Sequence, residues 1–157
     1  MNRSVRAGCH NKNVSINHPG QSLVEFALIL PLFVLFIIGI FELGRAFFSF
    51  IAISNAAREG ARVVTFWPGN TTIPNVRTAV NTELTNSPVV DVSNIDSIVI
   101  ACGSGNPMPV VNTDAALKAC HSGLPVRVTV TYEFDLILQF FFAQPLMLVR
   151  SAEMMVP

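Results

Sequence analysis

The chain opens with a polar segment, continues into a long uncharged apolar run, and then alternates between helical and strand-like patterns. No residue from Phe26 to Phe41 is charged, and Leu23, Val24 and Leu43 extend this run to the roughly 20 residues that cross a bilayer. One acidic residue, Glu25, stands at the start of the run. Because a carboxylate is costly in lipid and is usually functional there, its position indicates more than a simple anchor.

The apolar pattern continues beyond the expected membrane span as one face of a helix. Apolar residues recur mostly at steps of three and four, and the pairs Glu42–Arg45 and Glu59–Arg62 have the spacing of helical ion pairs. No proline lies between Pro31 and Pro68, so the pattern predicts one helix over about 22–65, kinked where Pro31 removes a backbone hydrogen bond. The expected inward face comprises Leu43, Ala46, Phe47, Phe50, Ile53, Ala57, Ala61 and Val64.

Small residues cluster on the outer half of this helix and allow another element to approach closely. We expect most of them to pack against the strands of this chain: they are Ala52, Ser54, Ala56, Ala57, Gly60 and Ala61.

The turn over 67–70 separates the long helix from a region of shorter elements. Thr72 is expected to cap a helix over 73–85, whose apolar face carries Ile73, Val76, Val80 and Leu84. Strands are predicted over 97–102, over 126–134, where apolar and polar residues alternate, and over 148–155, antiparallel to 126–134.

Two segments of this region have weaker patterns. A helical turn is predicted over 114–119. The apolar segment over 136–148 is too short for a second membrane span, and we interpret it as a loop with an exposed or partner-facing apolar surface.

Together the patterns predict an α+β protein: a long N-terminal membrane-spanning helix that continues into a small extracytoplasmic domain with a short helix and an antiparallel sheet. The expected parts are a cytoplasmic leader over 1–20, the helix over 21–66 with its span at about 23–43, and the domain over 67–157. The leader carries only positive charges, Arg3, Arg6 and Lys12, which favours a cytoplasmic N-terminus. A secretory signal peptide is the alternative, but no Ala-x-Ala site follows the apolar run.

Charge and cysteine content narrow the function further. Residues 67–157 hold four basic and seven acidic residues, a balance of minus three, and no basic patch indicates a nucleic-acid partner. Besides Cys9 in the leader, the cysteines are Cys102 and Cys120, a pair that is expected to form a disulfide in an oxidising compartment. A metal site that includes His121 is the alternative, but it lacks the usual number of ligands.

No catalytic motif is apparent, and we expect neither enzymatic activity nor a cofactor. His10 and His18 fall in the leader, and His121 is interpreted as a solvated loop residue. Asp91 and Asp96 are interpreted as solvated turn residues, with a cation site as the alternative. The segment Phe140–Phe142 is either a partner-binding patch or part of the core.

The segment from Gly20 to Phe33 resembles the start of TadE-like proteins, the pilin-like components of tight-adherence (Flp, type IVc) pilus systems. A glycine followed by a glutamate at the fifth position after it, here Gly20 and Glu25, is the pattern of a type IV pilin-like leader. The segment over 56–62, Ala-Ala-Arg-Glu-Gly-Ala-Arg, also resembles the family, and the resemblance covers residues 20–64. One departure is Gln21, where many pilins carry a methylated Phe or Met.

The resemblance implies cleavage between Gly20 and Gln21 by a prepilin peptidase, and a single-pass protein of the cytoplasmic (inner) membrane. It also implies the role of a minor pilin or pseudopilin in pilus assembly. The implied partners are the peptidase, the major pilin and other pilin-like subunits, the assembly platform and membrane lipid. A single-pass membrane-anchored binding module that is not part of a pilus is the alternative function.

The chemistry of Glu25 can also be argued from the residues alone. Cleavage would leave a free amine on Gln21, and a carboxylate that enters lipid is far less costly when it is paired. The amine of a neighbouring copy or of a related subunit is the natural partner, and such a pair would fix the axial register of packed helices. The alternative is that Glu25 stays hydrated at the level of the lipid headgroups.

Overall fold

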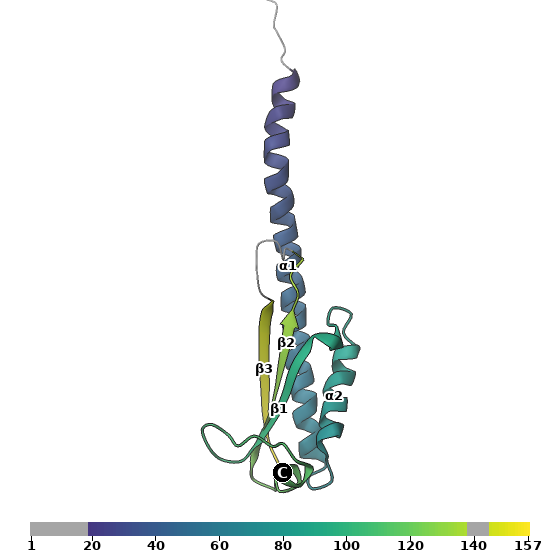
Figure 1. The fold of residues 1–157 in the computed structure, drawn as a ribbon, viewed down its shortest axis with the longest axis vertical. Helices are drawn as coiled ribbons and strands as arrows, with labels where there is room; N and C mark the ends of the chain where they lie inside the picture. The colour runs from purple at the N-terminus through teal and green to yellow at the C-terminus, as the bar shows by residue number, and fades with distance from the viewer. Residues whose placement is uncertain (1–18, 138–144) are drawn as a thin grey trace, which may run out of the picture. The chain divides into compact units, whose positions relative to one another are not determined.

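The computed structural model describes residues 19–137 and 145–157. Residues 1–18 of the predicted leader over 1–20, and the segment Phe140–Phe142, lie outside the described residues. The elements along the chain, shown in Figure 1, are helix α1 (Pro19–Phe66), helix α2 (Ile73–Thr85), the short 3₁₀ helix η1 (Val92–Asn94), strand β1 (Ile95–Cys102), helix α3 (Asp114–Lys118), strand β2 (Pro125–Phe134) and strand β3 (Leu146–Met155). A long apolar helix, a short helix and an antiparallel sheet confirm the predicted α+β class.

Helix α1 is continuous over 48 residues and includes Pro31. It begins at Pro19, earlier than predicted, with the proline in the first turn, where its missing N–H leaves no hydrogen bond unmade. Of the described helices, this one is long and apolar enough to cross a membrane. Its side chains from Gly20 to Phe41 are exposed, apart from a half-buried Ile38. A helix that is apolar all round and exposed suits lipid rather than water.

The chain divides after Ile38 into two compact units. The second unit, Gly39–Pro157, contains the outer part of α1 together with all the other elements. The outer part of α1 is therefore a structural member of the folded domain as well as the continuation of the span.

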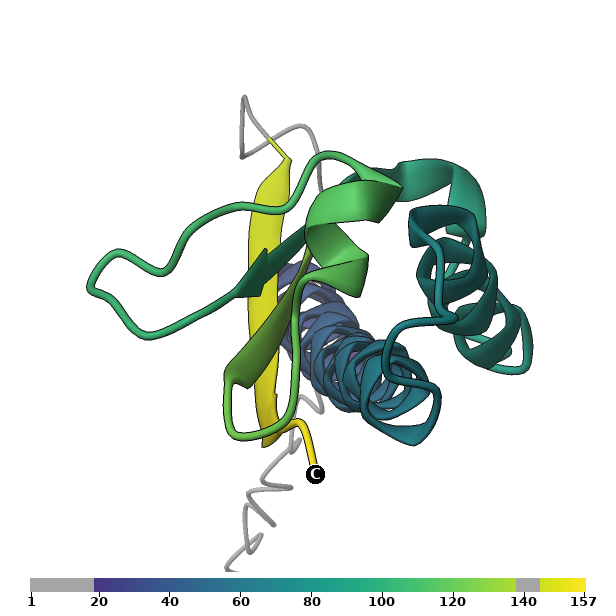
Figure 2. The ribbon, with the colours of Figure 1, turned by 90° about the horizontal axis from the view of Figure 1, so that it is seen from below.

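The sheet of the second unit has three antiparallel strands in the order β1-β2-β3. The central strand β2 alternates as predicted, with Val126, Val128, Val130, Tyr132 and Phe134 buried and the residues between them partly exposed. Figure 2 shows α1 and α2 on the same side of the sheet, the side to which these buried side chains belong. The third strand begins at Leu146, which shortens the loop that was predicted over 136–148.

The face that α1 turns to the sheet differs in part from the predicted one. Ile53, Ala57, Ala61 and Val64 are buried as expected. In the preceding turns the prediction holds for Ala46, which packs partly buried against the core, but it is wrong for Leu43, Phe47 and Phe50. These three are exposed, and the inward positions are Glu42 and Ser49. The residues of α1 that face the sheet have mainly short side chains, which let the backbones of helix and strands approach closely.

Gly60 marks the closest approach. A Cβ at this position would lie 2.8 Å from Val80 Cγ2 on α2 and 3.2 Å from Val128 Cγ1 on β2. The small residues were predicted to pack against the strands of this chain. Ala56, Ala57, Gly60 and Ala61 are buried, and at Gly60 the neighbours are helix α2 as well as strand β2.

The short helices are capped by local side chains. Thr72 precedes α2 and accepts a hydrogen bond from the Asn75 N–H, as predicted, and Val76, Val80 and Leu84 of α2 are buried. The predicted turn over 114–119 is α3, which is capped by Thr113. Asp114 Oδ1 accepts a hydrogen bond of 2.8 Å from the Ile73 N–H at the start of α2, and so links the two helices.

Candidate functional site

The predicted processing site lies in the first turn of α1. Gly20 and Gln21 directly follow Pro19, the first residue of the helix. No described atom outside the local backbone lies within 4 Å of a Cβ placed on Gly20, so the chain itself does not crowd this glycine. The site is thus open to a protease from the side of the described residues.

Glu25 stands one helical turn after Gln21. The Gln21 side chain Nε2 donates a hydrogen bond of 3.2 Å to Glu25 Oε1, and both residues are exposed. This contact puts the carboxylate on the same side of α1 as the residue that would carry the amine after cleavage. The second carboxylate oxygen has no hydrogen-bond partner among the described residues, and the group therefore retains capacity for a cation from another molecule.

A second acid at the other end of the apolar run has the opposite environment. Glu42 is only 7% exposed, and both of its carboxylate oxygens lie 3.2 Å from Arg45 Nη1. The backbone N–H of Ile137, just beyond β2, donates a further hydrogen bond to Glu42 Oε1. The Arg45 guanidinium in turn lies 5.1 Å from the centre of the Phe134 ring.

This arrangement, which we call the Glu42 clamp, ties the end of β2 to α1. Sequence spacing identified the Glu42–Arg45 pair but missed the bond from Ile137, because the two residues are 95 positions apart. The clamp compensates the charge of Glu42 within the chain. In the sequence, the one sign of this contact was an acid placed directly after an uncharged run.

The second predicted helical ion pair is also present. Arg62 Nε donates a hydrogen bond of 2.7 Å to Glu59 Oε2. This hydrogen bond from Arg62 lowers the pKa of the Glu59 carboxyl, and the positive charge of the guanidinium adds to the effect.

Cys102 and Cys120 are joined by a disulfide, with 6.0 Å between their Cα atoms. The bond connects the end of β1 to the segment that follows α3. The neighbouring His121 places its Nδ1 2.8 Å from the Ala119 carbonyl oxygen. No group of three or more potential metal ligands occurs within residues 19–137 and 145–157.

The two aspartates considered as cation ligands have different surroundings. Asp91 caps η1: its Oδ1 accepts hydrogen bonds from the Ser93 N–H at 2.9 Å and from the Ser93 hydroxyl at 2.7 Å. The backbone bond, followed by the hydroxyl bond, lowers the pKa of Asp91. Asp96 instead lines a groove beside β1.

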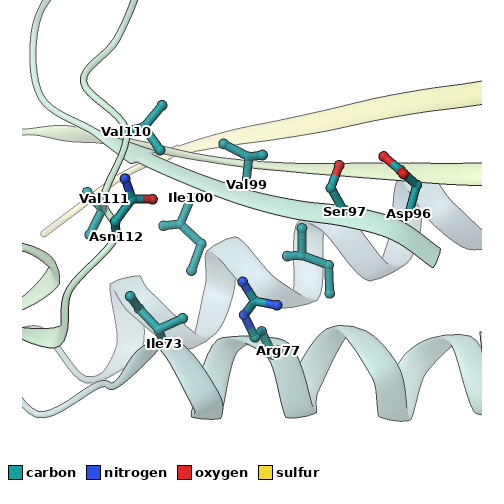
Figure 3. A pocket seen from close by; sticks show the side chains of 10 residues that line it. Ile73, Arg77, Asp96, Ser97, Val99, Ile100, Val110, Val111 and Asn112 are labelled. Carbon is teal, nitrogen blue, oxygen red and sulfur yellow. The ribbon is translucent and has the colours of Figure 1, made fainter.

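This groove has a volume of about 340 Å³ and lies between α2 and β1. In Figure 3 the Arg77 guanidinium points from α2 towards β1, with Ile73 and Ile100 beside it. A second groove of about 480 Å³ lies between Phe48 and Ile51 of α1 and the segment that ends α2.

Comparison with known proteins supports the resemblance at the N-terminal segment. Residues 20–62 match the family model described as TadE-like protein. No curated protein and no solved structure matches the chain significantly. The matched range holds Gly20, Gln21, Glu25 and the α1 part of the Glu42 clamp. The segment over residues 20–62 therefore carries the pattern of the TadE-like family, as its sequence predicted.

Proposed function

We propose that this protein is a minor pilin or pseudopilin that acts in the assembly of a tight-adherence pilus. The observation that carries the proposal is the match of residues 20–62 to the TadE-like family, on a helix that is exposed and apolar before it enters a folded domain. Such a chain suits a subunit that is stored in a membrane and then packed against other helices.

The proposed location is the cytoplasmic membrane, with the N-terminus in the cytoplasm and the domain outside. Arg3, Arg6 and Lys12 before the apolar run support this orientation through the positive-inside rule. The disulfide between Cys102 and Cys120 supports it independently, because such bonds persist in oxidising compartments outside the cytoplasm.

The proposed maturation is cleavage of the peptide bond between Gly20 and Gln21 by a prepilin peptidase. The new Gln21 amine and the Glu25 carboxylate would then lie one turn apart on α1. Glu25 pairs with the amine of a neighbouring subunit and so sets the axial register of the two helices. The partners in this scheme are the peptidase, the major pilin, other pilin-like subunits and the assembly platform.

The role proposed here is structural and assigns no catalytic activity to the chain. The alternative, a membrane-anchored binding module outside any pilus, draws support from the groove between α2 and β1. Leader cleavage separates the two functions, since a simple anchor has no need of it.

The test is co-expression with a prepilin peptidase, followed by extraction from the membrane and N-terminal sequencing with intact-mass measurement. We expect a mature chain that begins at Gln21. Gly20→Leu should abolish this cut, whereas the matched change Gly39→Leu, at another uncrowded glycine of α1, should leave it intact. A chain that still begins at Met1 beside active peptidase, or one cut beyond Phe41, would contradict the proposal.

A further inference from the structure

We propose that the folded domain makes its own contact with the lipid surface, separate from the membrane span. The contact surface, called the base surface here, consists of exposed apolar side chains around the Glu42 clamp: Leu43, Phe47, Ile137, Leu146 and Met147. This surface contacts the bilayer at the boundary between the lipid headgroups and the acyl chains. The inference rests on the part of the proposed function that makes α1 a membrane span.

Three contacts fix the height of the strand ends along α1. The Ile137 N–H bonds to Glu42, the Phe134 ring lies against Arg45, and the Phe50 ring lies 4.0 Å from the Arg150 guanidinium carbon. Since Phe134 pairs with Leu146 across the sheet, the start of β3 lies beside the end of β2. Figure 1 shows these two strand ends at the same stretch of α1.

This height coincides with the outer end of the predicted span. The span runs to about residue 43, and the interfacial layer of a bilayer adds roughly 5–8 Å on each side of the hydrocarbon. At about 1.5 Å per residue, that layer takes up the next four or five residues of α1. By this count Ile137, which is bonded to Glu42, lies at the outer end of the span, and Leu146, at the level of Arg45, lies within the interfacial layer.

The side chains at this height are apolar and open to the surroundings. Ile137 is 66% exposed, Leu146 47% and Met147 44%, and on α1 Leu43 is 74% and Phe47 63% exposed. A monomeric domain in water would gain by covering such residues. Transfer of apolar surface from water into lipid is favourable by about 25 cal/mol of free energy per Å².

The charges at the same height are mixed, since the acids Glu133 and Asp135 oppose entry into lipid. The clamp compensates Glu42, and the Arg45 side chain, which is 37% exposed, has the length to reach towards the headgroups. The nearby acids Glu133 and Asp135 add no positive charge, and Asp135 accepts a hydrogen bond of 2.7 Å from Asn94. The attraction is therefore hydrophobic, and it should not depend on anionic lipid or on salt.

The test uses a single tryptophan as a reporter of lipid contact. Trp67 is the only tryptophan of the chain, so Trp67→Phe gives a background without one. In this background Ile137→Trp places the reporter on the base surface. The full chain is reconstituted in phosphatidylcholine vesicles with or without brominated acyl chains, which quench tryptophan fluorescence on contact.

Two further single-tryptophan chains provide controls. Phe33→Trp lies in the apolar run and reports insertion of α1. Met155→Trp, at a residue that is 61% exposed, lies at the opposite end of β3 from Leu146 and reports the rest of the domain. We expect strong quenching at positions 33 and 137, a blue-shifted emission at 137, no quenching at 155, and no change at 137 when salt is raised.

Quenching at position 33 without quenching at position 137 would overturn the inference and leave the anchor intact. A blue-shifted but unquenched emission at 137 would also overturn it, because the surface would then be covered by protein rather than lipid. Absence of quenching at position 33 would mean that α1 does not insert, which refutes the membrane anchor itself and the inference with it. Quenching at 137 that disappears in high salt would contradict the hydrophobic mode of contact.

Discussion

Two acidic residues bound the apolar run of α1, and their surroundings separate their roles. Glu42 is buried, paired with Arg45 and bonded by a backbone amide, so its charge is compensated within the chain. Glu25 is exposed, and its hydrogen bond comes from a neutral amide. Among the described residues no positive charge compensates Glu25, which supports its proposed part in assembly.

We predict that Glu25→Ala leaves membrane insertion and leader cleavage largely unchanged but abolishes recruitment into the assembled structure. Removing the charge makes α1 easier to bury, so insertion has no reason to fail. The partner's amine would lose its counter-charge in lipid, which costs roughly a few kcal/mol. Cross-linking or co-purification with pilus components measures recruitment, and a leader-cleavage assay measures processing.

The matched variant is Glu25→Gln, which keeps a hydrogen-bonding side chain and removes only the charge. It should behave like Glu25→Ala if pairing with an amine is the function of the residue. Normal incorporation of both variants would reduce Glu25 to a hydrated residue at the headgroups and remove its role in assembly.

A further residue-scale prediction concerns Gly60. Gly60→Ala should lower the free energy of unfolding by about 1–3 kcal/mol, because the added methyl would meet Val80 Cγ2 at 2.8 Å and force the helices apart. The gain of up to about 1 kcal/mol in helix propensity does not offset this overpacking. Gly44→Ala is the control, since nothing lies within 4 Å of its Cβ. Urea unfolding in detergent micelles should show a lower midpoint for Gly60→Ala only.

Among the elements, the small side chains of α1 explain why the predicted inward face of this helix was partly wrong. Large apolar residues such as Phe47 and Phe50 normally indicate the buried face of a helix. Here the sheet packs on the stripe that runs through Ser49, Ala56 and Gly60, and Phe47 is left exposed. In a chain that borders a membrane, lipid or a partner helix competes with the core for apolar side chains, and so hydrophobicity alone does not identify the inner face.

The disulfide connects the end of β1 to the segment after α3. Its sequence separation of 18 residues corresponds to a stabilisation of about 3 kcal/mol in the chain-entropy account. We predict that the double change Cys102→Ala, Cys120→Ala lowers the free energy of unfolding by roughly this amount while α1 still inserts. Urea unfolding measures the loss.

Alkylation before and after reduction checks the bond directly in protein taken from the membrane. Mass spectrometry should find both cysteines blocked only after reduction. Two thiols that react freely in the native protein would exclude the bond.

At the scale of the whole molecule, acid should destabilise the domain through identifiable groups. The folded-state pKa values of Glu59 and Asp91 are both lowered, from ordinary values of 4.5 and 3.8, by hydrogen bonds from Arg62 and from Ser93. A lowered pKa contributes stability above the unfolded value and loses it as the pH falls through the folded one. We therefore predict that stability declines below about pH 4.5.

The double variant Glu59→Gln, Asp91→Asn isolates this contribution, because the amides keep their shape but do not titrate. Its urea midpoint should fall less than that of the natural chain between neutral pH and acid. Equal acid losses in the two proteins would show that other carboxylates carry the effect.

Features that depend on local pattern could be predicted from the sequence. Uncharged length indicated the span, Thr72 and the 3.6-residue period predicted α2, and the strict alternation over Val126–Phe134 predicted β2 and its buried face. The pattern around Gly20 and Glu25 was sufficient for the family resemblance, which the match over 20–62 confirmed. In each case the physical cause acts between residues a few positions apart, and the sequence therefore records it directly.

Features that join distant positions of the chain could not be predicted and follow from how the elements pack. Glu42 is part of a buried clamp because the Ile137 amide bonds to it, and Gly60 is buried because Val80 of α2 and Val128 of β2 approach it closely. The groove between α2 and β1, the groove between α1 and the segment that ends α2, and the apolar base surface around Ile137 likewise combine side chains from separate elements. Such contacts depend on where the packed elements place their side chains in space, and a one-dimensional pattern does not contain that information.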